Sequence, residues 1–168
     1  MDIIIYRSHA GELNLNQIDN SQDMTSPSNP LLVTEGIPRF DLIKPVHIEP
    51  AVNQILVDAE KKLKKIEQDI QPTWDDLVKP LEDITIPFEY AWKPIEHLLN
   101  VKNSPELRKE HEKMQSKVVQ FWLRLEQSKS IYEGLLSIKN GSEWNELGKA
   151  ERRVIDLKLR DAKLAGVG

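Results

Sequence analysis

The run IEPAVNQILVDAEKKLKKIEQDI, residues 48–70, decides the fold of this chain. Its apolar residues are separated by gaps of four, three, four, four, three and four: Ile48, Val52, Ile55, Ala59, Leu63, Ile66 and Ile70. A repeat of about 3.6 residues places them on one face of an α-helix, which must be buried against other elements. Pro45 and Pro50 are compatible with the start of this helix, because N–H groups in a first turn lack intrahelical partners. Pro72 is expected to end it.

Lysines occupy the positions between this apolar stripe, at Lys61, Lys62, Lys64 and Lys65. Two interpretations are open, a phosphate-binding patch and an ordinary solvated helix face. Acidic residues interleave at Glu60, Glu67 and Asp69, and this mixing of charges favours the solvated face.

A second helical pattern starts at Thr73, which has the form of an N-cap followed by acids at Asp75 and Asp76. Its apolar face comprises Trp74, Leu77, Leu81, Ile84, Phe88, Trp92, Ile95 and Leu98. Three prolines interrupt the pattern at Pro80, Pro87 and Pro94. Because an interior proline costs about 3 kcal/mol, we expect a kinked or segmented element with breaks near Pro80 and Pro87. The segment 84–86 also admits a short strand.

Two further helices are expected. Ser104 and Pro105 have the character of an N-cap and a first helical residue. The stripe that follows comprises Leu107, His111, Met114, Val118, Phe121 and Leu125, and it continues through Ile131, Leu135 and Ile138 after a possible bend at 128–130. Asn140 and Gly141 end it. The last helix is predicted over 144–164, with Leu147, Ala150, Val154, Leu157 and Leu164 facing inward. Asp161 interrupts that face and is expected to pair with Arg160 or Lys158.

The fold class predicted is all-α, with four to five mostly antiparallel helices and no sheet. Residues 29–168 form one helical domain. It begins with a Pro-rich strap over 30–45 that is expected to pack Leu31, Leu32, Ile37, Phe40 and Ile43. Residues 1–28 are polar and aperiodic, and they are predicted to be a flexible extension. Met24 is an alternative start of translation.

Composition excludes several classes of function. The net charge is -4; residues 1–29 carry -3 of it, and the other 139 residues hold 22 basic against 23 acidic side chains. This balance argues against a nucleic-acid partner and against a polybasic membrane anchor. Cysteine is absent, so thiol catalysis and disulfides are excluded. No apolar run approaches the roughly 20 residues of a membrane span, and no secretory leader is evident, so cytoplasmic residence is expected.

The pattern contains no recognisable active site. The string His111-Glu112-Lys113-Met114-Gln115 starts like the zinc motif H-E-x-x-H, but Gln115 stands where the second histidine should be. Catalytic zinc needs three protein ligands, and this segment supplies one at most. His9, His47 and His97 are isolated, and the acidic pairs Asp75–Asp76 and Glu82–Asp83 do not share a helix face. We therefore expect no catalytic, cofactor-binding or metal-binding residue in this chain.

Short strings along the chain nevertheless occur in a specific order. They are NPLL (29–32), IPRF (37–40), IKPVHIEPA (43–51), TWDDL (73–77), PLE (80–82), HL (97–98), VKNSPELR (101–108) and LRDAKLAGVG (159–168). In order and spacing they resemble the N-terminal segment of the oligopeptidase A branch of the thimet-oligopeptidase family of zinc peptidases. The resemblance covers about residues 29–168. Ala162, where the family would have an aromatic residue, and Pro87 depart from it, and both departures concern packing.

The resemblance implies a much longer, nearly all-helical zinc enzyme that cleaves short peptides inside a channel between two lobes. Its H-E-x-x-H motif lies far downstream, so the zinc of the full-length family has no ligand here. This chain is then expected to form channel wall and to be inactive alone, and its partners would be a complementary catalytic chain or domain and, in the whole enzyme, short peptides. The alternatives are a split enzyme, a free-standing helical interaction module, and a non-functional remnant.

Overall fold

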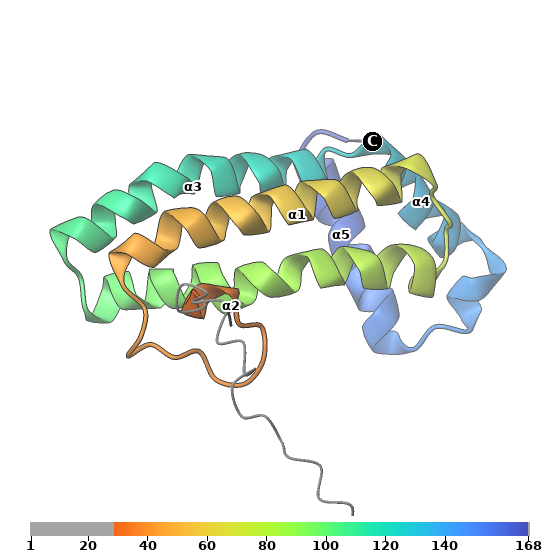
Figure 1. The fold of residues 1–168 in the computed structure, drawn as a ribbon. Coiled ribbons are helices and arrows are strands. Elements are labelled where there is room, and N and C mark those ends of the chain that lie inside the picture. Colours follow the sequence, from red (N-terminus) through yellow and green to blue (C-terminus); the bar gives the residue numbers. More distant parts are fainter. Residues whose placement is uncertain (1–28, 168) are drawn as a thin grey trace, which may run out of the picture.

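The computed structural model describes residues 29–167, and all regular structure within that range is helical. Three long helices lie side by side: α1 (Ile48–Gln68), α2 (Lys79–Val101) and α3 (Pro105–Glu126) (Figure 1). Helices α1 and α3 run in the same direction, and α2 runs in the opposite direction (Figure 1). Two shorter helices, α4 (Lys129–Asn140) and α5 (Lys149–Leu164), pack at the end where α1 finishes (Figure 1). The prediction of an all-α fold with four to five helices is confirmed. The expected flexible extension, residues 1–28, lies outside the described residues.

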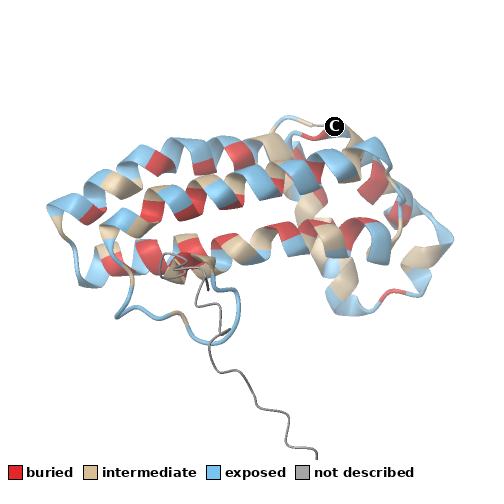
Figure 2. Ribbon diagram, in the orientation of Figure 1, coloured by how far each residue is buried: buried red, intermediate tan, exposed pale blue. Residues whose placement is uncertain are grey.

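Helix α1 lies between α2 and α3 and carries the centre of the core (Figures 1 and 2). The predicted stripe is buried along most of its length, at Ile48, Val52, Ile55, Ala59 and Leu63. Its last two members, Ile66 and Ile70, are half-buried, and the helix ends at Gln68, before Pro72. The stripe thus places α1 in the middle of a layer of helices with its opposite face in solvent.

The second element starts where the sequence predicts. Thr73 Oγ1 accepts a hydrogen bond from the Asp76 N–H at 3.0 Å, which is the expected cap. The turn that follows, η3 (Trp74–Val78), is π-helical and passes into α2 one residue before Pro80. The predicted break near Pro80 therefore exists as a change from π-helical to α-helical geometry.

The predicted break near Pro87 is wrong, because α2 continues through Pro87 and Pro94 to Val101. The strand alternative for 84–86 is also wrong, since these residues are helical. Two interior prolines cost roughly 6 kcal/mol together. Burial of large side chains on the same face contributes roughly 8–15 kcal/mol, which outweighs that cost. The buried side chains are Leu81, Ile84, Phe88, Ile95 and Leu98.

Helix α3 begins as predicted, with Ser104 Oγ accepting from the Leu107 N–H at 3.1 Å. The possible bend at 128–130 is a complete break, since α3 ends at Glu126 and α4 begins at Lys129. Ser128 at this junction is buried, and its hydroxyl donates to the Glu67 carboxylate at the end of α1. A polar contact to another helix therefore determines where the chain turns.

The prediction for the last helix is wrong in its start and partly wrong in its inward face. Leu147 is buried as predicted, and Val154 and Leu157 are half-buried. Residues Ser142–Asn145 form a separate 3-10 turn, η4, and α5 starts at Lys149. The buried face of α5 consists of Ile155, Leu159 and Ala162, whereas Ala150 and Leu164 are exposed. The predicted pair between Asp161 and Arg160 is confirmed, with a contact of 2.7 Å.

The strap that precedes α1 packs less of its apolar surface than expected. Leu31, in the short helix η1 (Pro30–Leu32), is fully buried, and the Asn29 side chain fixes it by donating to the His47 carbonyl at 2.8 Å. Ile37 is 85% exposed, so the prediction that it packs is wrong. None of the helices within residues 29–167 has the length and apolar character needed to cross a lipid bilayer.

Candidate functional site

The histidines singled out in the sequence do not come together. His111 stacks on Trp92 with ring centroids 4.6 Å apart, and its Nε2 is buried without a hydrogen-bond partner. Burial lowers the pKa of His111 below its usual 6.5. His97 lies against Phe40, and His47 Nδ1 accepts from the Lys44 N–H. Each of these side chains thus has a packing or capping role.

No group of three potential metal ligands occurs among the residues that the structure describes. His111 faces an indole rather than a second ligand, and Gln115 one turn further on is exposed. The residues within 29–167 therefore do not fit a zinc site. His9 lies outside the described range.

The acidic pairs have separate partners. Asp75 pairs with Lys79 at 2.6 Å, and Asp76 accepts from the Thr73 hydroxyl at 2.9 Å. Glu82 reaches across to Lys158 on α5 at 2.6 Å. These contacts stabilise helix ends and helix pairs, and they leave no shared-proton dyad of the kind that acid catalysis uses.

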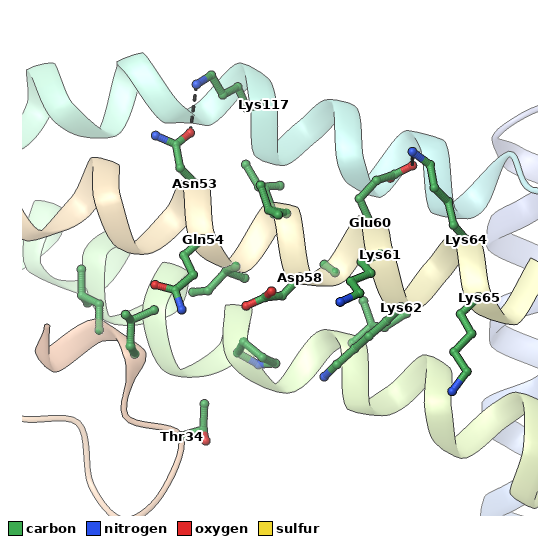
Figure 3. Close-up of a pocket in the computed structure, with 18 of the residues that line it drawn as sticks. Thr34, Asn53, Gln54, Asp58, Glu60, Lys61, Lys62, Lys64, Lys65 and Lys117 are labelled. Carbon is green, nitrogen blue, oxygen red and sulfur yellow. Dashed lines mark hydrogen bonds and ion pairs between the residues drawn. The ribbon is translucent and has the colours of Figure 1, made fainter. Parts of the chain in front are cut away.

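The principal concave feature is a groove of about 1350 Å³ between α1 and α2, which we call the α1–α2 groove (Figure 3). One end is formed by the η1 segment and Thr34. Its apolar lining comes from three elements: Leu31, Leu32, Ile55, Leu56, Val57, Ala59, Ile84 and Pro87. Val57 is 68% exposed, so an apolar side chain faces solvent beside this lining.

The rim of the groove is cationic. Five lysines line it against two carboxylates, and Lys64 is paired with Glu60 at 3.5 Å. Lys117 on α3 donates to Asn53 at 3.0 Å. The remaining rim lysines are exposed, with no ion pair among the described residues: Lys61, Lys62 and Lys65. This is the solvated face that the mixed charges predicted, and it now borders an apolar surface.

Sequence reasoning missed this groove, although part of its signal is present. Leu56 and Val57 are apolar but lie outside the buried stripe of α1. Extra apolar residues on the exposed side of an amphipathic helix indicate a second contact surface. The opposite wall, at Ile84 and Pro87, comes from a different helix, and its proximity depends on the tertiary fold.

Comparison with known proteins defines the class. Residues 52–168 match the family model of the neurolysin/thimet oligopeptidase N-terminal domain. The chain therefore belongs to this family and carries its N-terminal domain, as the resemblance in sequence predicted.

Individual relatives are oligopeptidases A. The chain is 38% identical over 147 residues to the probable cytosolic oligopeptidase A of Arabidopsis thaliana, covering 88% of this chain and 21% of that protein. It is 38% identical over 145 residues to the organellar oligopeptidase A of the same plant, covering 86% of this chain and 18% of that protein. It is 34% identical over 143 residues to oligopeptidase A of Haemophilus influenzae, covering 85% of this chain and 21% of that protein. The chain thus spans about a fifth of the length of these curated relatives.

Proposed function

We propose that this chain is the N-terminal helical portion of a zinc-dependent oligopeptidase that hydrolyses short peptides. In this role it forms part of the wall of the substrate channel and supplies no zinc ligand. The observation that carries the proposal is the match of residues 52–168 to an N-terminal domain whose relatives are more than four times as long as this chain. A wall of this kind limits which substrates enter, by steric exclusion, without taking part in bond cleavage.

The α1–α2 groove supports a role that depends on more polypeptide. A contiguous apolar surface that is open to solvent is a common sign of a contact surface for another segment. The cationic rim suits a segment with apolar side chains flanked by carboxylates. We propose that the occupant is the polypeptide carrying the remaining four-fifths of the enzyme, joined to this chain or supplied as a separate catalytic chain.

The first test measures zinc content and peptide hydrolysis of the purified chain. We expect no stoichiometric zinc and no cleavage of a fluorogenic short peptide. Stoichiometric zinc together with hydrolysis by residues 1–168 alone would overturn the proposal. Cytoplasmic location stays a prediction, because relatives of equal similarity are named as cytosolic and as organellar.

The second test mixes this chain with the polypeptide that carries the H-E-x-x-H motif and measures recovered peptidase activity. Val57→Asp places a charge in the groove and should reduce the recovered activity at least tenfold. Val119→Asp is the matched control, because Val119 is 49% exposed on α3 and does not line the groove. Equal activity with both variants would refute the assignment of the groove. Binding to a partner that is not a peptidase would favour the interaction-module alternative.

A further inference from the structure

A second cavity, of about 190 Å³, lies where α2, α3, α4 and α5 meet, and it is separate from the α1–α2 groove. Its apolar wall is formed by Leu81, Ile131 and Leu135, which are 1%, 5% and 2% exposed. Trp122 and Tyr132 add aromatic surface. The cavity is partly open to solvent, so a small molecule can reach these side chains.

Ala162 on α5 contributes to the space because of its small side chain. It lines the cavity and is only 5% exposed, so its position faces the interior, yet its side chain is a single methyl group. A dry apolar cavity of about 150 Å³ in another protein takes up benzene, which shows that a space of this size accepts one aromatic ring. The cavity is therefore matched in size and lining to a six-membered ring.

One side of the same cavity is acidic. Glu126 and Asp161 both line it. Lys158 also lines the cavity and is paired with Glu82, and Asp161 is paired with Arg160. The Glu126 carboxyl has no hydrogen bond or ion pair among the described residues. Burial, and secondarily the charge of Asp161, raises the pKa of Glu126. A cation placed here would stabilise the ionised form of both carboxylates.

We propose that this cavity binds a small aromatic amine, with the ring against Leu81, Ile131 and Leu135 and the ammonium group on the Glu126 carboxylate. The ring loses its contact with water, and the ammonium group gains a charge-assisted hydrogen bond. This inference concerns the chain alone and does not depend on the proposed peptidase role.

The test is a titration of the purified chain with 2-phenylethylamine, followed by NMR shifts of the Trp122 indole and by calorimetry. The neutral analogue 2-phenylethanol is titrated in parallel. We expect saturable binding of both compounds, with the amine about three- to tenfold tighter. Failure of both compounds to saturate the chain up to 20 mM would overturn the proposal.

Substitutions at Ala162 and at Glu126 locate the site. Ala162→Phe fills the cavity and should abolish binding of both compounds, whereas Ala150→Phe, at an exposed position of the same helix, should leave binding unchanged. Ala162→Leu replaces Ala162→Phe if the larger side chain prevents folding, as judged by circular dichroism. Glu126→Gln should remove the preference for the amine while 2-phenylethanol still binds. Unchanged binding in both cavity-filling variants, or an unchanged preference in Glu126→Gln, would contradict the proposal.

Discussion

Glu67 joins three segments at the C-terminal end of α1, and its replacement by glutamine tests how the helices are held together. Arg124 on α3 donates to Glu67 through both terminal nitrogens, one of them at 2.8 Å from Oε1. The Ser128 hydroxyl, at the break between α3 and α4, donates to the same carboxylate. The Glu67 side chain is 19% exposed, so water replaces these contacts poorly. The hydrogen bond from Arg124 is the main reason why the pKa of Glu67 is lowered.

The magnitude follows from these contacts. Hydrogen bonds to a charged group contribute roughly 1.5–3 kcal/mol each, and glutamine retains one acceptor oxygen for Arg124 or Ser128. We expect Glu67→Gln to reduce the free energy of unfolding by about 2–3 kcal/mol. For the 139 described residues, an unfolding entropy of about 2 cal/mol/K per residue converts this loss to a fall in Tm of roughly 7–10 °C.

Thermal unfolding followed by circular dichroism, at pH 7 and at pH 3, measures this effect. Because the folded-state pKa of Glu67 is lowered, its stabilisation is complete above the unfolded-state value of 4.5 and is lost as the pH falls through the folded-state value. The difference in Tm between wild type and Glu67→Gln should therefore shrink at pH 3. Glu60→Gln, which removes only the pair with Lys64 within α1, is the control and should change Tm by less than about 2 °C. A difference below 2 °C for Glu67→Gln at pH 7, or one of equal size at pH 3, would refute this reasoning.

Three further predictions concern packing in the helices. A Cβ on Gly134 would lie 2.8 Å from Leu77 Cδ2 and 2.9 Å from Ile70 Cγ2, so Gly134→Val should lower Tm by roughly 3–10 °C. Ser137→Val, on the exposed side of α4, should change Tm little, and calorimetry of the two variants measures the difference. Pro87→Ala returns a hydrogen-bond donor to α2 and should stabilise the chain by about 1–2 kcal/mol in urea unfolding, and a loss of stability would contradict the account. Because the pKa of His111 is lowered in the folded state, the unfolded chain binds more protons below pH 6.5, and the free energy of unfolding should decrease as the pH is lowered. His111→Phe, which keeps the stack on Trp92, should flatten this dependence between about pH 7 and pH 5.

The helices and their starts were predictable because local chemistry determines them. The stripe of α1 and the caps at Thr73 and Ser104 follow from residues within a few positions of each other. The break between α3 and α4 was only partly predictable, since it depends on the contact of Ser128 with Glu67, 61 residues earlier. The continuity of α2 through Pro87 was not, because burial against other helices outweighs the cost of the proline.

The face of the last helix shows the limit of periodicity most clearly. The sequence over 154–162 offers two apolar stripes displaced by one residue, one through Val154 and Leu157 and one through Ile155 and Leu159. Both satisfy the helical repeat, and only the packing of α5 against its neighbours selects the second. The α1–α2 groove and the cavity beside Ala162 were unpredictable for the same reason, since their walls come from residues far apart in the chain.

We propose that this chain is the N-terminal part of a zinc oligopeptidase whose remaining four-fifths supplies the chemistry. The nucleotide sequence beyond the codon for Gly168, translated in all three frames, tests it most directly. The account predicts a reading frame that encodes further helices and an H-E-x-x-H motif. The absence of such a frame would contradict a joined enzyme. Together with no recovered activity on mixing with a separate catalytic chain, it would leave the peptidase fold as ancestry only.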